Sequence, residues 1–189
     1  MKKRVAVIFA GGKSSRMGRD KSLLPFGECL SLAEYQYRRL SLLFDKVYIS
    51  AKENKFDFEV EVIEDCYSTS SPLVALVSVF ETLDIEEIFV LSVDAPFVNV
   101  EVIEKLYYEA DNQSSYIVAE SPNGLEPLCG IYRRSLFLEA KKALLEENHR
   151  LVSLLNRVEG ERVKIGEHYP FMNLNHREEY EEALRIERG

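Results

Sequence analysis

The sequence has 189 residues, of which 46% are hydrophobic and 30% are charged, and its formal net charge at pH 7 is −8. This length and apolar content predict one domain over residues 1–189 and exclude a disordered or fibrous chain. The acidic balance argues against a nucleic-acid partner, and no apolar run approaches the ~20 residues that a membrane span needs. We therefore expect a cytoplasmic protein that binds neither nucleic acid nor membrane.

The first half of the chain alternates between predicted strands and helices. Residues 5–9 form a continuous apolar run, as expected of a strand buried on both faces of a parallel sheet. Apolar residues at helical spacing predict a helix over about 31–44, and Ser71-Pro72 supplies an N-cap and a first-turn proline for another. Two further strands are predicted at 46–50 and 60–63.

The second half continues the alternation. The apolar run 88–93 predicts a buried strand that ends at Asp94. The remaining predicted elements are a helix over 99–108, a strand over 116–119, a turn at 122–124, a strand over 128–132, a helix over 135–147 that begins at a serine cap, a short strand over 163–165 and a last helix over 175–186. This order predicts a three-layer α/β/α sandwich around a Rossmann-like, mostly parallel sheet, whose ligands bind beyond the carboxyl ends of the strands.

The loop from Ala10 to Lys21 follows the first predicted strand and combines glycines with basic residues. Its first two glycines are adjacent, unlike those of the G-x-G-x-x-G dinucleotide motif, and Val7 stands where a Walker A motif needs its first glycine. The composition nevertheless suits a triphosphate, because glycines expose backbone N–H groups and Arg16 and Lys21 can neutralise phosphate oxygens. The alternative is a surface loop rich in turn-forming residues.

Asp94 stands at the end of a buried strand, two residues before Pro96. An acid at the ligand-binding edge is a natural Mg²⁺ ligand, because Mg²⁺ is often held by one or two carboxylates together with phosphates and water. Turn chemistry explains an Asp-x-Pro sequence equally well. Asp65, which follows the third predicted strand, has the same two interpretations.

The segment from Phe9 to Lys21 resembles the signature loop L-A-G-G-x-S-x-R-M-G-x-D-K of the molybdenum cofactor guanylyltransferases. Related sugar-phosphate and isoprenoid nucleotidyltransferases usually carry A-A-G and a Pro-Lys ending instead. Other segments that resemble this family follow in order: Val62–Asp65, Ser71–Leu76, Ser92–Pro96, Glu126–Tyr132 and Asn173–Asn175. The departures are Phe9 for leucine, Ser71 and Ala75 for glycines, His176-Arg177 for Thr-Pro, and Ser50 for an asparagine of some members.

The resemblance implies a nucleotide-diphospho-sugar transferase-like fold and a Mg²⁺-dependent reaction. In that reaction GMP passes from GTP to molybdenum-molybdopterin, and pyrophosphate leaves. Arg16, Lys21 and Asp94 are the implied catalytic residues, with the two cations on the phosphates and Asp94 on Mg²⁺. Asp65 would accept hydrogen bonds from guanine or ribose. The full set implied for GTP is Phe9, Ala10, Gly11, Gly12, Lys21, Asp65 and Asp94.

The acceptor side is implied by the same resemblance. Asn173 and Asn175 would face molybdopterin, and so would Arg133. An N-cap of the last predicted helix is an equally good interpretation of Asn175. The family also implies handover of the pterin from other molybdenum cofactor biosynthesis proteins. Three other functions stay open: a cytidylyltransferase for the same pterin, another small-molecule nucleotidyltransferase, and a non-catalytic nucleotide-binding regulator.

Overall fold

The structure is a computed structural model that describes residues 4–11, 20–111, 113–166 and 169–188. Within these ranges seven strands form one sheet in the order β3-β2-β1-β4-β6-β5-β7. The strands are β1 (Val5–Phe9), β2 (Lys46–Ala51), β3 (Glu61–Glu64), β4 (Glu87–Ser92), β5 (Tyr116–Ser121), β6 (Gly124–Arg133) and β7 (Glu161–Lys164). β6 is antiparallel to both of its neighbours, and every other neighbouring pair is parallel. The predicted mostly parallel sheet is confirmed.

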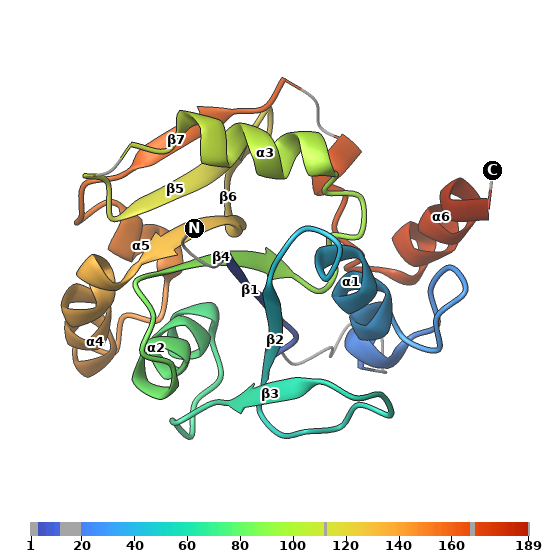
Figure 1. Cartoon of the computed structure of the whole chain (residues 1–189), viewed down its shortest axis with the longest axis horizontal. Helices are drawn as coiled ribbons and strands as arrows, with labels where there is room; N and C mark the ends of the chain where they lie inside the picture. Colours follow the sequence, from blue (N-terminus) through green and yellow to red (C-terminus); the bar gives the residue numbers. More distant parts are fainter. Residues whose placement is uncertain (1–3, 12–19, 112, 167–168, 189) are drawn as a thin grey trace.

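Helices cover both faces of the sheet and complete the predicted three layers (Figure 1). They are α1 (Leu32–Leu40), α2 (Pro72–Thr82), α3 (Val100–Glu109), α4 (Phe137–Leu145), α5 (Leu151–Leu155) and α6 (Arg177–Arg188), with short 3₁₀ turns η1 (Lys21–Leu23), η2 (Arg134–Leu136) and η3 (Tyr169–Phe171). Apolar residues of α1, α3 and α6 share one core cluster, and those of α2, α4 and α5 share the other. The sheet therefore separates two cores.

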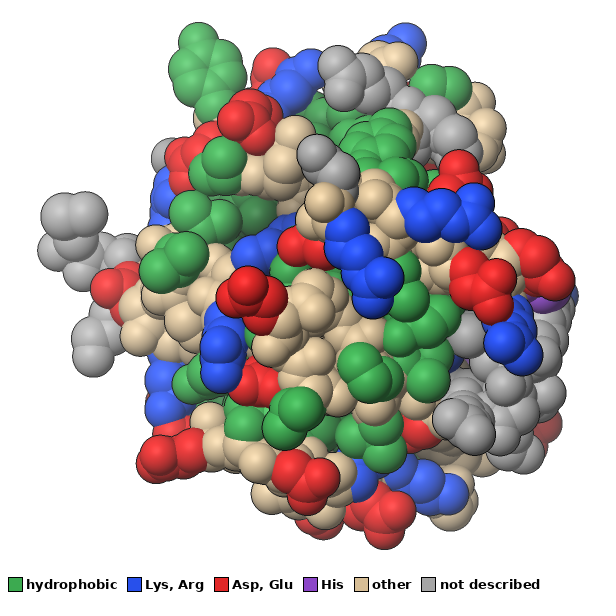
Figure 2. Space-filling model, turned by 90° about the vertical axis from the view of Figure 1, so that its right-hand side faces the viewer, with side chains coloured by type: hydrophobic (Ala, Val, Ile, Leu, Met, Phe, Trp, Pro, Cys, Tyr) green, Lys and Arg blue, Asp and Glu red, His purple; other side chains and the backbone are tan. Residues whose placement is uncertain are grey.

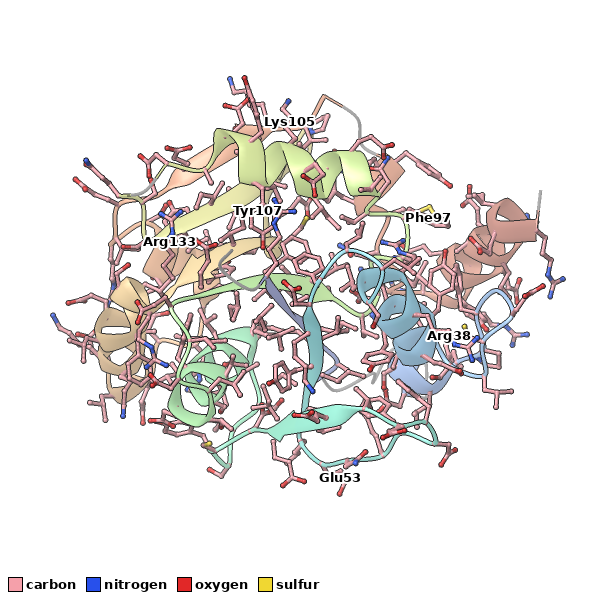
Figure 3. All side chains as sticks on the ribbon, viewed as in Figure 1. Arg38, Glu53, Phe97, Lys105, Tyr107 and Arg133 are labelled. Carbon is pink, nitrogen blue, oxygen red and sulfur yellow. The ribbon has the colours of Figure 1, made fainter. Side chains whose placement is uncertain are left out.

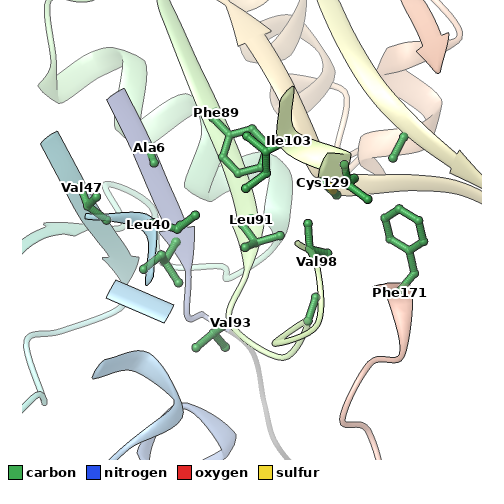
Figure 4. Packing of buried hydrophobic residues seen from close by; sticks show 14 of the residues in the cluster. Ala6, Leu40, Val47, Phe89, Leu91, Val93, Val98, Ile103, Cys129 and Phe171 are labelled. Carbon is green, nitrogen blue, oxygen red and sulfur yellow. The ribbon is translucent and has the colours of Figure 1, made fainter. Parts of the chain in front are cut away.

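The central strand β1 shows why this sequence builds two cores. Successive side chains of a strand point to opposite faces, so Ala6 and Ile8 enter one cluster while Val7 and Phe9 enter the other. Figure 4 shows the first cluster, in which Phe89 and Leu91 of β4 pack against Ile103 of α3. A continuous apolar run is thus the signature of a strand with helices on both sides.

Side-chain caps mark the starts of three helices, α1, α2 and α3. Ser71 caps α2 by accepting a hydrogen bond from the Val74 N–H at 3.2 Å, as predicted. The predicted serine cap of the helix at 135 is wrong, because α4 begins at Phe137 without a side-chain cap. The preceding turn is instead fixed by tertiary bonds, among them one from the Arg134 N–H to the Glu86 carbonyl. The five-residue helix α5 was not predicted.

The surface of the described ranges carries charges of both signs. On the face that Figure 2 displays, acidic and basic side chains are interspersed with small apolar areas. None of the helices that the structure describes combines the length and the apolarity needed to cross a membrane.

Candidate active site

The ends of three strands place the predicted site residues at one edge of the sheet. β1, β3 and β4 are parallel to one another through their pairings, so their carboxyl ends share an edge. Backbone bonds continue past the strands there, from the Val93 N–H to the Phe9 carbonyl at 3.0 Å and from the Ala10 N–H to the Ser50 carbonyl at 2.9 Å. The prediction that Asp94 and the start of the loop after Phe9 lie on one edge is confirmed.

Lys21 and Asp94 form an ion pair at this edge. The Lys21 Nζ donates to Asp94 Oδ2 at 3.0 Å and to Asn175 Oδ1 at 2.8 Å, and the two charged side chains are 16% and 18% exposed. Lys21 opens the turn η1, which Asp20 caps by accepting from the Ser22 N–H at 3.0 Å. The cap fixes the direction in which the lysine leaves the backbone. Three segments far apart in the chain therefore meet at one ammonium group.

Asp94 is also held from its other side. The Ser92 hydroxyl donates to Asp94 Oδ1 at 2.6 Å, and the Leu174 N–H donates to the Asp94 carbonyl at 3.0 Å. Both carboxylate oxygens thus have one donor each and retain further acceptor capacity. In the described ranges no three His, Cys, Asp or Glu side chains gather around one point. One carboxylate beside amide oxygens is a donor set that fits Mg²⁺ when phosphates and water complete its shell.

A pocket of about 250 Å³ opens beside Asp94. It lies between the end of β4, the first half of β6 and the segment that precedes α6. Its lining residues are Ser92, Asp94, Ala95, Glu126, Pro127, Leu128, Cys129, Phe171, Asn173 and Asn175. The structure thus brings Asn173 and Asn175 to Asp94, on the side away from Asp65. The antiparallel direction of β6 is what delivers its first residues to this edge.

Asp65 lies on the other side of the β1 end, next to Gly11. A Cβ built on Gly11 would be 3.6 Å from Ser70 Oγ and 4.0 Å from Asp65 Oδ2. Burial raises the pKa of the Asp65 carboxyl, while the Ser70 hydrogen bond and the Lys52 charge act against that rise. Asp65 Oδ1 is buried and has no hydrogen-bond donor within the described part of the chain. A buried carboxylate oxygen without a donor is costly, and an N–H or O–H of a ligand would satisfy it.

The backbone at the end of β1 is partly engaged by the sheet. The Phe9 carbonyl and the Ala10 N–H are used in the bonds to Val93 and Ser50. Gly11, the next residue, is exposed. The nucleotide contacts implied for Phe9 and Ala10 therefore stay predictions, and Gly12 and Arg16 lie outside the described residues.

Lys55 lies beside the start of the loop that follows β1, although the sequence did not single it out. Its ammonium pairs with the Asp20 carboxylate and lies 3.5 Å from the Ala10 carbonyl. Burial alone would raise the pKa of Asp20, but the hydrogen bonds from Lys55 and Ser22 lower it below its ordinary value. A lysine in a polar loop between two strands carries no local signal of this contact.

Arg133 was expected to face the pterin, and the structure contradicts this. Its Nε donates to Glu87 Oε2 at 2.7 Å, and its other nitrogens donate to the Ser114 and Asp111 carbonyls at 2.6 Å each. Because β6 is antiparallel to β4, Arg133 pairs with Glu87 at the amino end of β4, at the edge opposite Asp94. Figure 3 shows Arg133 far from Phe97, which follows Asp94 in the chain.

The alternative role of Asn175 as an N-cap is also wrong. α6 begins at Arg177, and Glu179 Oε2 accepts from the N–H groups of His176 at 2.8 Å and Asn175 at 2.5 Å. The Asn175 side chain accepts from Lys21 instead. Because Glu179 accepts from the N–H groups at the start of α6, the Asn175 side chain is available to contact Lys21.

Comparison with known proteins gives consistent matches. Residues 6–163 match the model of the MobA-like NTP transferase domain. The molybdenum cofactor guanylyltransferase of Campylobacter jejuni is 38% identical over 93% of this chain and 92% of that protein. The protein of the same name from Helicobacter pylori is 33% identical over 95% and 91%.

Solved structures share the fold at lower identity. Molybdopterin-guanine dinucleotide biosynthesis protein A of Archaeoglobus fulgidus superposes with a TM-score of 0.83 over 96% of this chain and 97% of that one, at 21% identity. The 2-C-methyl-D-erythritol 4-phosphate cytidylyltransferase of Thermus thermophilus gives a TM-score of 0.68 over the whole of both chains, at 14% identity. The fold is therefore common to transferases that use different nucleotides.

Proposed function

The chain belongs to the MobA-like NTP transferase family, and from this premise we propose that it transfers GMP from GTP to molybdenum-molybdopterin. The products are the guanine dinucleotide form of the cofactor and pyrophosphate. The observation that carries the proposal is the Lys21–Asp94–Asn175 set, which lies between a buried acceptor at Asp65 and the pocket beside Asp94. Nucleotide and acceptor would thus meet over one cation and one carboxylate.

The reaction needs positioning and charge stabilisation rather than a protein nucleophile. A terminal phosphate oxygen of molybdopterin attacks the α-phosphorus of GTP, and the bond from that phosphorus to the oxygen bridging to the β-phosphate breaks. Pyrophosphate leaves with the bonding electron pair. The Lys21 ammonium would stabilise the charge that develops on the phosphate oxygens. Arg16 stays a predicted second cation.

We propose Mg²⁺ as the metal, held by Asp94 and the substrate phosphates. When bound, Mg²⁺ would supply charge neutralisation to the triphosphate and fix its orientation. Lys21 Nζ and Ser92 Oγ each donate one hydrogen bond to the Asp94 carboxylate and would orient it for the metal. Lys21 could then turn from Asp94 toward the phosphates, because an ammonium on a flexible stem reorients readily.

Guanine selection would depend on Asp65. The Watson–Crick edge of guanine presents adjacent ring N–H and amino donors, which match a carboxylate, whereas the corresponding edge of cytosine presents one amino donor and two acceptors. Asp65 Oδ1 is buried and lacks a donor from the residues described, so a guanine N–H would satisfy it. This geometry supports GTP over CTP.

The acceptor would occupy the pocket lined by Asn173 and Asn175. The amides of Asn173 and Asn175 can donate to the phosphate end. Pro127, Leu128 and Phe171 supply an apolar wall for a ring system. We further propose that other molybdenum cofactor biosynthesis proteins deliver the pterin to this pocket.

The test is an assay with purified protein, Mg²⁺, molybdenum-molybdopterin and GTP or CTP labelled at the α-phosphate. The proposal expects labelled guanine dinucleotide and stoichiometric pyrophosphate from GTP. A preference for CTP would refute the guanylyl assignment. Binding of GTP with no pyrophosphate release at saturating acceptor would make the protein a nucleotide-binding regulator instead.

A further inference from the structure

Gln36 is a fully buried amide in the apolar side of α1. Its neighbours one turn away on the helix, Leu32 and Leu40, are fully buried core residues. Burying an amide costs free energy unless hydrogen bonds compensate for the lost hydration. A glutamine at this position therefore needs hydrogen-bond partners, whereas a leucine would need none.

Those partners are the backbone carbonyls that flank Asp94. The Gln36 Nε2 lies 2.9 Å from the Ala95 carbonyl oxygen, 3.3 Å from that of Ser92 and 3.5 Å from that of Val93. Three acceptors converging on one atom require the amide nitrogen there rather than the amide oxygen. The carbonyl of Asp94 itself accepts from the Leu174 N–H. The Ser92 and Ala95 carbonyls also accept from the Ala95 N–H at 3.3 Å and the Val98 N–H at 3.5 Å, whereas Gln36 Oε1 is buried and has no donor among the described residues.

Arg39, on the same helix, extends this hold along the loop. Its guanidinium donates to the carbonyls of Pro96 and Val98. The side chains of Val93 and Val98 anchor the same loop in the core, as Figure 4 shows. Beyond β4, where the sheet ladder has ended, side chains of α1 donate to the carbonyls of this loop alongside backbone N–H groups.

We infer that Gln36 is a positioning residue that orients the Asp94 carboxylate toward Lys21 and, under the proposed function, toward the metal-bound triphosphate. It touches neither substrate nor metal in this role. Its amide contacts the carbonyls of Val93 and Ala95, one residue to either side of Asp94, while the Leu174 N–H holds the carbonyl of Asp94 itself. Together these bonds fix the backbone from which the carboxylate leaves. Partners that orient a metal ligand typically contribute on the order of 10- to 100-fold in metal affinity or activity.

The variant that tests this is Gln36→Met, which keeps the volume and removes the donor. Its matched control is Tyr116→Phe, which removes another buried donor to a carbonyl, the 3.0 Å bond from the Tyr116 hydroxyl to the Leu155 carbonyl. That bond lies in β5 and α5, away from Asp94. Thermal unfolding of both proteins measures how much general stability each substitution removes.

Two readouts then separate positioning from general destabilisation. Hydrogen exchange of peptides that cover residues 92–98 should be on the order of 10-fold faster in Gln36→Met and unchanged in Tyr116→Phe. In the transfer assay, Gln36→Met should lower kcat on the order of 10-fold or more and raise the Mg²⁺ concentration for half-maximal rate several-fold, while the KM for the pterin stays within about twofold.

Parental exchange in residues 92–98 of a folded Gln36→Met protein would overturn the inference. A Gln36→Met enzyme whose rate depends on Mg²⁺ as in the parent would also overturn it. So would a Tyr116→Phe enzyme with the same fall in kcat and the same rise in exchange. If Gln36→Met does not fold, Gln36→Asn decides by the same criteria, because it keeps the amide on a stem too short to reach all three carbonyls. The exchange measurement needs no substrate and tests the inference by itself. If the parent protein shows no guanylyl transfer, that result refutes the proposed function and leaves the exchange result standing.

Discussion

Replacing Lys21 by methionine keeps most of the side-chain volume and removes the ammonium at the centre of the site. The substitution deletes the hydrogen bonds to Asp94 Oδ2 at 3.0 Å and to Asn175 Oδ1 at 2.8 Å. At an effective dielectric constant of ~20, unit charges 3.0 Å apart attract by about 5.5 kcal/mol. Most of that attraction offsets the lost hydration of the two groups, so we expect the free energy of unfolding to fall by about 1–3 kcal/mol.

The effect on turnover should exceed the effect on folding. Losing one preorganised charge contact costs on the order of 10²- to 10³-fold in kcat, or about 2.7–4 kcal/mol of transition-state stabilisation. We therefore expect Lys21→Met to release pyrophosphate at least ~10²-fold more slowly than the parent at saturating substrates. Pyrophosphate release gives kcat and KM, and thermal unfolding gives the change in stability.

The matched control is Lys105→Met. Lys105 is an exposed lysine of α3 whose ammonium donates to the Lys164 carbonyl at 2.8 Å, and it is not part of the Lys21–Asp94–Asn175 set. This variant should keep parental kcat. A folded Lys21→Met enzyme with parental turnover would refute the reasoning, because the charge at the junction of nucleotide and acceptor would then contribute nothing to the transition state.

Two further substitutions test other parts of the site, and a third tests the placement of Arg133 outside it. Asp94→Asn should weaken the dependence of the rate on Mg²⁺, and a titration identical to that of the parent would place the metal ligand elsewhere. Asp65→Asn should raise the KM for GTP and reduce the preference for GTP over CTP; an unchanged preference would remove Asp65 from base selection. Burial raises the Asp65 pKa above its ordinary 3.8, so the folded state holds that proton more tightly than the unfolded chain. The parent therefore loses stability as the pH rises through the window just above 3.8. Asp65→Asn should therefore be stabilising relative to the parent at pH 7 and less so at pH 3, and denaturant unfolding at both pH values checks this. Arg133→Ala should lower stability by about 2–4 kcal/mol through Glu87 and two carbonyls while leaving the KM for the pterin unchanged; a raised KM in the folded fraction would return Arg133 to the acceptor site.

The fold was largely predictable because its central elements have strong local patterns. The apolar runs of β1 and β4 and the Ser71-Pro72 start of α2 all led to the correct element. The direction of β6 was not predictable, because its apolar segment packs equally well either way along the sheet. The antiparallel direction puts Arg133, at the end of β6, at the edge opposite Asp94, contrary to the expectation, and it puts Glu126, near the start of β6, in the pocket beside Asp94.

Some residues of the candidate site were predictable from the sequence and others were not. Lys21 and Asp94 are recognisable because they follow apolar strands and match a family signature. Gln36 and Lys55 gave no signal, because each acts through contacts with residues more than thirty positions away in the chain. The role of Asn175 was ambiguous for a related reason: asparagine before a helix normally caps it, and only the competing Glu179 carboxylate reveals that it does not.

The bonds of the Lys21 ammonium span 73 and 154 positions of the chain. Closing loops of that length is slow, so contacts of this kind form late in folding. The sheet can assemble from β1 to β7 before the segment that carries Asn175 docks against Lys21. Synthesis on the ribosome also delivers that segment after the strands from β1 to β7. A chain that lacks the segment from Asn175 onward therefore loses the Lys21–Asn175 bond and one wall of the pocket, but keeps both members of the Lys21–Asp94 pair.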